Sequence, residues 1–275
     1  MVLDEILAHK RREVAERQHT RPQASLPRTG APRDFAAALR QPGLSIIAEI
    51  KRRSPSGGEL RPGARAADLA RTYASAGAVA LSVLTDCRYF GGEDADLVEA
   101  RAACDLPVLR KDFLLDEYQV YESRALGADA VLLIVRALAP IDLARLIALA
   151  EELGMAALVE THSGDEVRIA LEAGARLVGV NNRDLDTLVT DPSLALGLRD
   201  LVPPDKIFVA ESGVSDETQL DALAAAGVDA VLIGEALLRA PDPGAKLRDL
   251  SLTARGPLAP PGPTAPGPGQ RGVGR

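Results

Sequence analysis

Four segments of the chain share one pattern of hydrophobic and polar positions. In each, a stretch with helical spacing ends in glycine and is followed by a run of apolar, often β-branched residues; the four segments are 76–81, 126–133, 173–180 and 226–233. Glycine readily adopts the left-handed conformation that closes a helix. A short apolar run bounded in this way is typical of a buried strand. The pattern therefore predicts four repeats of a helix followed by a strand.

Four further apolar runs lie between these segments, at 45–50, 107–110, 155–160 and 206–210. They bring the number of predicted strands to eight, and a stretch with helical spacing separates successive strands. The strands begin roughly 20 to 35 residues apart, which is the length of one strand plus one helix. Alternating strands and helices indicate parallel pairing with right-handed crossovers.

Eight such units over about 200 residues close most economically into a (β/α)8 barrel, the TIM barrel. An open, doubly wound sheet is the alternative, but no glycine-rich dinucleotide motif follows the first strand. Two further helices, at 3–18 and 34–39, precede the first strand and are expected to cover the barrel. We therefore predict one α/β barrel over 1–255, including this N-terminal extension. Residues 256–275 are dominated by Gly and Pro, which predicts a disordered tail.

The composition supports an interior built from small aliphatic side chains. Hydrophobic residues make up 47% of the chain but aromatic residues only 3%, with no Trp. Such a composition suits helix-covered parallel strands, which are apolar on both faces. The formal net charge of −7 argues against nucleic acid or an anionic membrane as a partner.

The cysteines and the N-terminus indicate the cellular compartment in which the protein is expected. Cys87 and Cys104 lie in unrelated settings with no Cys/His cluster, so no metal site is predicted. A reducing cytoplasm is the expected compartment for such a chain. The N-terminus is too charged for a signal peptide, and no apolar run is long enough to span a membrane.

Charged residues follow several of the predicted strands, at the end of the barrel where active sites lie. In the first strand Glu49 and Lys51 share a face because side chains alternate, and inward charges are costly unless paired or used. In the third, Lys111 and Phe113 share a face; Lys111 is a candidate acid whose pKa burial is expected to lower. The fifth strand ends at Glu160, a candidate base.

Other strand ends bring polar groups to the same rim. His162 lies beyond the fifth strand and is expected to be a surface or supporting residue rather than a catalyst. The sixth strand leads to Asn181 and Arg183, and a guanidinium suits carboxylate or phosphate.

Glycines after the last two strands predict a phosphate site. Gly213 and Gly234 follow the seventh and eighth strands, and a helix begins directly after Gly234. Glycines at these two positions are typical of the phosphate cradle of such barrels. The basic loop 52–58 is rich in Ser and Gly, and we expect it to bind phosphate through Ser54 and to close over the site.

The strand ends resemble those of the indole-3-glycerol-phosphate synthase family over about residues 34–240. Seven motifs occur in order, each at the end of its proper strand, which argues against coincidence. They are IAEIKRRSPS (47–56), LTDCRYFGG (84–92), PVLRKDF (107–113), LVETH (158–162), GVNNRDL (179–185), AESGVS (210–215) and IGEALL (233–238). Two small departures are Gly57, where many relatives carry Lys, and LVETH in place of LVEVH.

The resemblance implies a role for each matching residue. It implies a catalytic group of Lys111, Glu160, Lys51, Glu49, Asn181, Glu211 and Ser212. It implies substrate contacts from Arg183, Phe113, Phe90 and Leu188, and phosphate contacts from Ser54, Gly213, Gly234 and Glu235. The division of labour among Glu49, Lys51 and Glu160 stays open.

The resemblance also implies the reaction. A small-molecule sugar phosphate, 1-(2-carboxyphenylamino)-1-deoxyribulose 5-phosphate, is closed to indole-3-glycerol phosphate with loss of CO2 and water, in tryptophan biosynthesis. Neither metal nor organic cofactor is implied. Lys111 is expected to protonate the ketone oxygen.

Three alternatives fit the same residues less well. A Schiff-base aldolase would use Lys111 as its nucleophile. The Lys111/Glu160 pair and the KRRSPS loop argue against another phosphate-binding barrel isomerase, such as phosphoribosylanthranilate isomerase. In a non-catalytic phosphate binder, these acid and base candidates would have no function.

Overall fold

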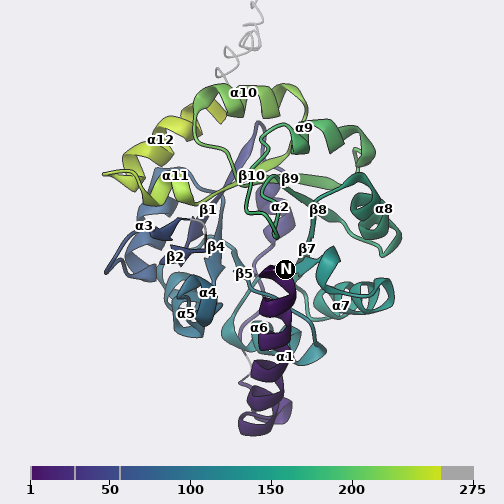
Figure 1. The fold of residues 1–275 in the computed structure, drawn as a ribbon. Helices are drawn as coiled ribbons and strands as arrows, with labels where there is room; N and C mark the ends of the chain where they lie inside the picture. Colours follow the sequence, from purple (N-terminus) through teal and green to yellow (C-terminus); the bar gives the residue numbers. More distant parts are fainter. Residues whose placement is uncertain (1, 28, 56, 255–275) are drawn as a thin grey trace, which may run out of the picture.

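The computed structural model describes residues 2–27, 29–55 and 57–254, so the tail predicted at 256–275 lies outside the described residues. Eight parallel strands form a closed barrel, which confirms the predicted TIM-barrel fold (Figure 1). Around the barrel the order is β1-β10-β9-β8-β7-β6-β5-β4, and β1 pairs with both β10 and β4.

Each of the eight predicted strands is present, at or within a few residues of its predicted position. The strands are β1 (Ser45–Ile50), β4 (Ala80–Leu84), β5 (Val108–Lys111), β6 (Ala130–Ile134), β7 (Ala156–Thr161), β8 (Leu177–Asn181), β9 (Ile207–Glu211) and β10 (Ala230–Ile233). The sequence did not indicate a short antiparallel hairpin in the loop after β1, formed by β2 (Arg53–Ser54) and β3 (Gly58–Glu59).

Helices surround the strands (Figure 1). The long ones are α3 (Ala66–Ala76), α5 (Asp94–Ala103), α6 (Glu117–Leu126), α7 (Pro140–Glu152), α8 (Gly164–Glu172), α10 (Glu217–Ala225) and α12 (Pro243–Ala254). Shorter elements are α4 (Cys87–Phe90), α9 (Leu194–Leu198) and α11 (Glu235–Leu238), with 3-10 turns η1 (Gln23–Ser25), η2 (Val135–Ala137) and η3 (Arg199–Leu201). Gly77 and Gly127 close α3 and α6 at φ values of 105° and 89°, as the repeat predicted.

The core has an inner and an outer layer. Inward-facing side chains such as Ile47, Leu109 and Leu158 fill the barrel and are fully buried. A larger cluster of Ala, Val and Leu lies between the strands and the surrounding helices. The strands are therefore apolar on both faces, as the composition indicated.

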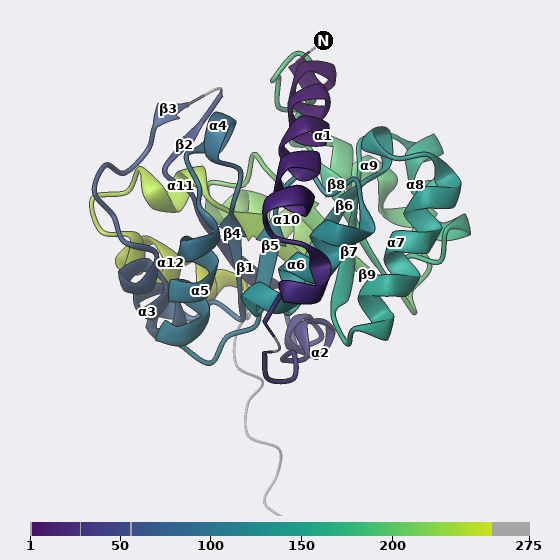
Figure 2. The same ribbon diagram turned by 90° about the horizontal axis from the view of Figure 1, so that it is seen from below.

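The two N-terminal helices cover opposite ends of the barrel, as expected (Figure 2). α2 (Phe35–Leu39) packs Phe35 and Leu39 against residues at the starts of the strands. α1 (Val2–Thr20) begins at the opposite end, the same end as the β2–β3 hairpin, where the strands terminate. α1 therefore contributes to the end of the barrel at which chemistry is expected.

Buried ion pairs hold α1 against the barrel. Lys10 Nζ lies 2.9 Å from Asp86 Oδ2 and 2.9 Å from Asp112 Oδ1, and the Lys10 side chain is only 1% exposed. Arg110, also buried, lies 3.3 Å from Asp112 and 3.0 Å from Glu122. Because Asp112 follows β5 directly, the attachment of α1 also fixes the end of that strand.

We expect Lys10→Met to lower the free energy of unfolding by about 3–5 kcal/mol at neutral pH, since it leaves two buried carboxylates without their ammonium. Burial raises the pKa of Asp112, but Lys10 and Arg110 outweigh burial and hold this pKa well below its usual value. The stabilisation by Asp112 is thus present above the ordinary carboxylate pKa and lost as the pH falls toward the lowered one. Urea unfolding at neutral pH and at about pH 3 should show a smaller difference between the two proteins in acid, because pH 3 lies below the ordinary carboxylate pKa. An undiminished difference in acid would contradict the assignment; Lys206→Met, at a partly exposed lysine, is the control.

Candidate active site

A pocket of about 560 Å³ lies at the ends of the strands, a size typical of small-molecule sites. All residues that the sequence predicted for the site line it. They are Glu49, Lys51, Ser54, Phe90, Lys111, Phe113, Glu160, Asn181, Arg183, Leu188, Glu211, Ser212, Gly213, Gly234 and Glu235. Residues distant in sequence therefore converge on one mouth of the barrel.

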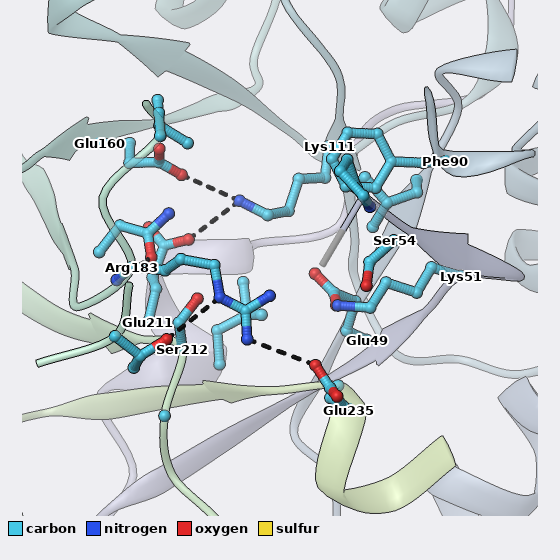
Figure 3. A pocket seen from close by; sticks show the side chains of 18 of the residues that line it. Glu49, Lys51, Ser54, Phe90, Lys111, Glu160, Arg183, Glu211, Ser212 and Glu235 are labelled. Carbon is cyan, nitrogen blue, oxygen red and sulfur yellow. Dashed lines mark hydrogen bonds and ion pairs between the residues drawn. The ribbon is translucent and has the colours of Figure 1, made fainter. Parts of the chain in front are cut away.

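An ammonium group and two carboxylates form the floor of the pocket (Figure 3). Lys111 Nζ lies 3.0 Å from Glu160 Oε2 and 3.0 Å from Glu211 Oε2. Both glutamate side chains are 1% exposed. The three residues come from β5, β7 and β9, which are alternate strands, and alternate strands supply each side-chain layer inside such barrels.

The carboxylates reverse the expected pKa shift of Lys111. Burial by itself lowers this pKa, but Glu160, Glu211 and Glu49 together outweigh burial and raise it well above the usual value. The prediction of a lowered pKa was therefore wrong, because it considered burial without these partners. Lys111 is accordingly a fully charged ammonium at neutral pH.

The two buried carboxylates differ in protonation. Burial raises both pKa values, but Lys111 and His162 hold the pKa of Glu160 down at about 2. For Glu211, burial and the negative charge of Glu160 outweigh Lys111 and raise the pKa to about 7. Two carboxyl groups that share one ammonium cannot ionise independently, so their pKa values move apart. The floor of the pocket thus contains one ionised carboxylate and one that titrates near neutrality.

A second ion pair faces this cluster across the pocket. Lys51 and Glu49 form it at the end of β1, and Figure 3 shows the pair on the side opposite Glu160 and Glu211. The side chain of Glu49 is buried. The pairing satisfies the inward charges that the sequence identified as costly.

Basic and glycine residues line another end of the pocket. Arg183 Nη2 lies 3.3 Å from Glu235 Oε2, and Arg239 Nε donates to Glu235 Oε1 at 2.9 Å. The Ser54 hydroxyl accepts a hydrogen bond from the Gly57 amide at 2.9 Å. Two guanidinium groups suit an anionic ligand group. Arg239 was not predicted; its only sequence sign is its place one helical turn after Glu235.

Strained backbone also marks this pocket. Among the described residues, the non-glycine residues with positive φ are Leu188 (61°) and Ser212 (63°), and both line it. Gly213 follows at φ 78°, and a Cβ there would lie 2.7 Å from Thr190 Cγ2. Such strain is found preferentially at functional sites.

The remaining wall is apolar. The rings of Phe90 and Phe113 lie 6.3 Å apart between centroids, inclined by 37°. Leu188 and, from α1, Leu3 and Ile6 belong to the same apolar lining. The part of Leu3 and Ile6 in the pocket was not predicted, because nothing local in the sequence shows that α1 reaches the mouth. This wall fits a flat aromatic group.

Within residues 2–27, 29–55 and 57–254, no group of three or more His, Cys, Asp or Glu side chains is placed to hold a metal ion. None of the helices in these ranges has the length and apolar character needed to cross a membrane.

The closed barrel, the buried ammonium–carboxylate layer and the basic end define a TIM-barrel protein whose pocket suits a small anionic ligand. The family model for indole-3-glycerol phosphate synthase matches residues 3–250. The chain therefore belongs to the indole-3-glycerol phosphate synthase family, and it is an enzyme of the decarboxylating lyase class, in tryptophan biosynthesis, that this family defines.

Curated relatives agree with this assignment over nearly their whole length. Indole-3-glycerol phosphate synthase 2 of Streptomyces coelicolor is 52% identical over 90% of this chain and 98% of its own. The corresponding synthase of Micrococcus luteus is 49% identical over 92% of this chain and 99% of its own.

Solved structures with low identity share the fold alone. Thiamine phosphate pyrophosphorylase from Pyrococcus furiosus superposes with a TM-score of 0.57 at 18% identity, covering 75% of this chain and 93% of that protein. A putative lactate oxidase of Pediococcus acidilactici gives 0.55 at 16% identity, covering 80% of this chain and 74% of that one.

Proposed function

We propose that this chain closes 1-(2-carboxyphenylamino)-1-deoxyribulose 5-phosphate to indole-3-glycerol phosphate, CO2 and water, with Lys111 as the acid and Glu160 as the base. The observation that carries the proposal is the 3.0 Å contact of Lys111 with each of two buried carboxylates on the floor of a pocket that has an apolar wall and a basic end. We place the reaction in the cytoplasm, since Cys87 and Cys104 are both free thiols.

The pocket has a place for each part of this substrate. The aromatic ring packs against Phe113, Phe90 and Leu188. The phosphate binds where Ser54, Gly213, Gly234 and the backbone of Glu235 provide a hydroxyl and closely approachable amides. Arg183, Asn181 and Ser212 orient the substrate carboxylate and hydroxyls. Binding both ends folds the chain between them, which brings ring carbon and ketone together.

Ring closure places negative charge on the ketone oxygen. The ammonium of Lys111 stabilises this charge and transfers a proton to the oxygen. Its carboxylate partners keep Lys111 charged before the reaction, so the proton is available in every free enzyme molecule. Loss of CO2 then restores the aromatic ring.

Dehydration follows and needs a base as well as an acid. The hydroxyl that leaves is the former ketone oxygen, which already lies beside Lys111. Lys51, held by Glu49, binds the substrate carboxylate first and afterwards holds the departing hydroxyl by a hydrogen bond, while Lys111 protonates it a second time. Glu160 removes the proton that the new ring loses, and Glu211 keeps Lys111 in place between the two carboxylates.

The direct test is to mix the purified protein with the carboxyphenylamino sugar phosphate and follow indole fluorescence. We expect stoichiometric formation of indole-3-glycerol phosphate and CO2. Binding without turnover would refute the proposal in favour of a phosphate-ligand binder. Borohydride trapping of an adduct on Lys111 would instead support Schiff-base chemistry.

Gly234→Ala tests how closely the phosphate end depends on the Glu49–Lys51 pair. A Cβ at Gly234 would lie 3.0 Å from Cβ and 2.9 Å from Cδ of Glu49, so Glu49 must move and its ion pair with Lys51 is disturbed. We expect kcat/KM to fall about 10-fold, equivalent to about 1.4 kcal/mol. Gly197→Ala is the matched control, because a Cβ at this position in α9 meets no atom within 4 Å. Equal kinetics for both variants would contradict this dependence.

A further inference from the structure

The proposed reaction takes up one proton from solvent in each turnover. The substrate carboxylate is negatively charged and leaves as neutral CO2. The ketone oxygen receives two protons before it leaves as water, and Glu160 recovers only one from the new ring. The second must reach Lys111 from outside, although the substrate then lies between Lys111 and the pocket mouth.

A histidine lies behind Glu160, on the side away from Lys111. Glu160 binds Lys111 through Oε2, while its Oε1 lies 3.4 Å from Nε2 of His162. Both of these atoms are buried, and neither has a hydrogen-bond partner within the described part of the chain. Buried polar atoms are rarely left in this state. A proton shared between the two atoms would satisfy both.

The second ring nitrogen of His162, Nδ1, lies on the side of the protein surface. Nδ1 of His162 lies 3.4 Å from Glu166 Oε2, and Arg136 Nε donates to Glu166 Oε1 at 2.7 Å. Exposure of the side chains rises along this series, from 1% for Glu160 and His162 to 13% for Glu166 and 27% for Arg136. His162 does not line the substrate pocket. The series therefore connects the base to solvent by a route that bound substrate does not cover.

We propose that His162 relays protons from solvent, through Glu166, to Glu160 and so to Lys111. The inference rests on the proposed function. His162 touches no substrate and acts only through Glu160.

The protons balance in each step of this relay. A solvent proton binds Glu166 and passes to Nδ1 of His162, while the proton on Nε2 moves to Oε1 of Glu160. A half-turn of the carboxyl group presents this proton to the neutral amine of Lys111, which becomes an ammonium again. The imidazole has exchanged one tautomer for the other. Between turnovers, when the pocket is open to solvent, Nε2 takes up a proton through Glu160 and Nδ1 releases one through Glu166, which restores the first tautomer. No electrons are transferred.

The charges around His162 favour this role. Glu160 on β7, Glu166 on α8 and Arg136 in η2 face the ring, and Glu211 on β9 lies within its electrostatic reach. Burial lowers the pKa of His162, but the carboxylates of Glu166 and Glu160 outweigh burial and Arg136 and raise it. A histidine with a raised pKa accepts a proton from neutral solution more readily than an ordinary one.

The test compares two variants that interrupt the relay at different points. His162→Gln keeps a polar group beside Glu160 but cannot carry a proton through, and Glu166→Gln interrupts the solvent end without touching Glu160. In both we expect CO2 release in the first turnover at the wild-type rate, because Lys111 starts protonated. Indole formation should slow on the order of 10-fold, and more at higher pH, since proton supply limits only dehydration.

The controls separate a relay from a structural role. His9→Gln, at a histidine on α1 that pairs with Glu13, should leave both rates unchanged. Slow indole formation in His162→Gln alone, with Glu166→Gln normal, would show that His162 only positions Glu160 and would overturn the relay. So would normal rates in both variants. A wild-type protein that forms no indole would refute the proposed function instead, so the two failures are distinguishable.

Discussion

Replacing Lys111 by methionine is expected to lower kcat by at least about 10²-fold, the usual contribution of a positioned general acid. The variant keeps the volume of the side chain but has neither the charge that stabilises the alkoxide nor the proton that it receives. Substrate affinity should change less, because the phosphate and the aromatic ring bind at other parts of the pocket. Steady-state and single-turnover kinetics with the carboxyphenylamino sugar phosphate measure both quantities.

The same substitution removes the partner of two buried carboxylates. Glu160 and Glu211 then face each other without a cation, so one of them takes up a proton rather than remain charged. Thermal unfolding must therefore accompany the kinetics, to show that the variant is folded at the assay temperature. Lys206→Met, which removes a partly exposed lysine paired with Asp205, is the control for a general effect of losing a lysine. Turnover near the wild-type value in a folded Lys111→Met protein would exclude the acid role.

Much of the fold could be predicted because the barrel is a local repeat. The unit of helix, glycine and apolar strand needs only neighbouring residues to specify it, and Gly77 and Gly127 close their helices as that unit requires. The β2–β3 hairpin was missed because its two strands contain two residues each, too few to show an alternating pattern. The place of α1 was also only partly predictable. Its apolar stripe indicates that it packs, but the contacts of Lys10 with Asp86 and Asp112 decide where.

The residues of the site could be predicted from the sequence, but the partners of their charges could not. Parallel strands bring their ends together, so polar residues at those ends can be assigned to one pocket from the strand pattern. The strand ends do not show which side chain pairs with each charged residue. The pKa of Lys111 was predicted in the wrong direction because its two carboxylate neighbours lie 49 and 100 residues away in the chain. The contacts of Arg239 with Glu235 and of His162 with Glu160 are local in the chain, but the strand pattern does not show that these side chains turn toward each other.

Glu160→Gln is expected to lower kcat on the order of 10²-fold, because the variant cannot remove the proton that the new ring loses. Glutamine has the same shape, so Lys111 keeps a hydrogen-bond acceptor at this position. The loss should fall on dehydration. CO2 release in the first turnover should stay near the wild-type rate while indole formation slows, and the two signals can be recorded in one rapid-mixing experiment. An equal loss in both signals would show that Glu160 acts before decarboxylation.

The same variant should also change the titration of Glu211. In the wild type, burial and the charge of Glu160 together raise the pKa of Glu211 to about 7, against the opposing effect of Lys111. Glutamine at position 160 removes the negative charge and leaves Lys111 to Glu211 alone, so both changes lower the pKa of Glu211. Carboxyl NMR of labelled glutamate should therefore show a resonance that titrates near neutrality in the wild type and at lower pH in the variant. A titration that does not move would mean that the two carboxylates do not share Lys111, and the acid–base layer proposed for this pocket would lose its physical basis.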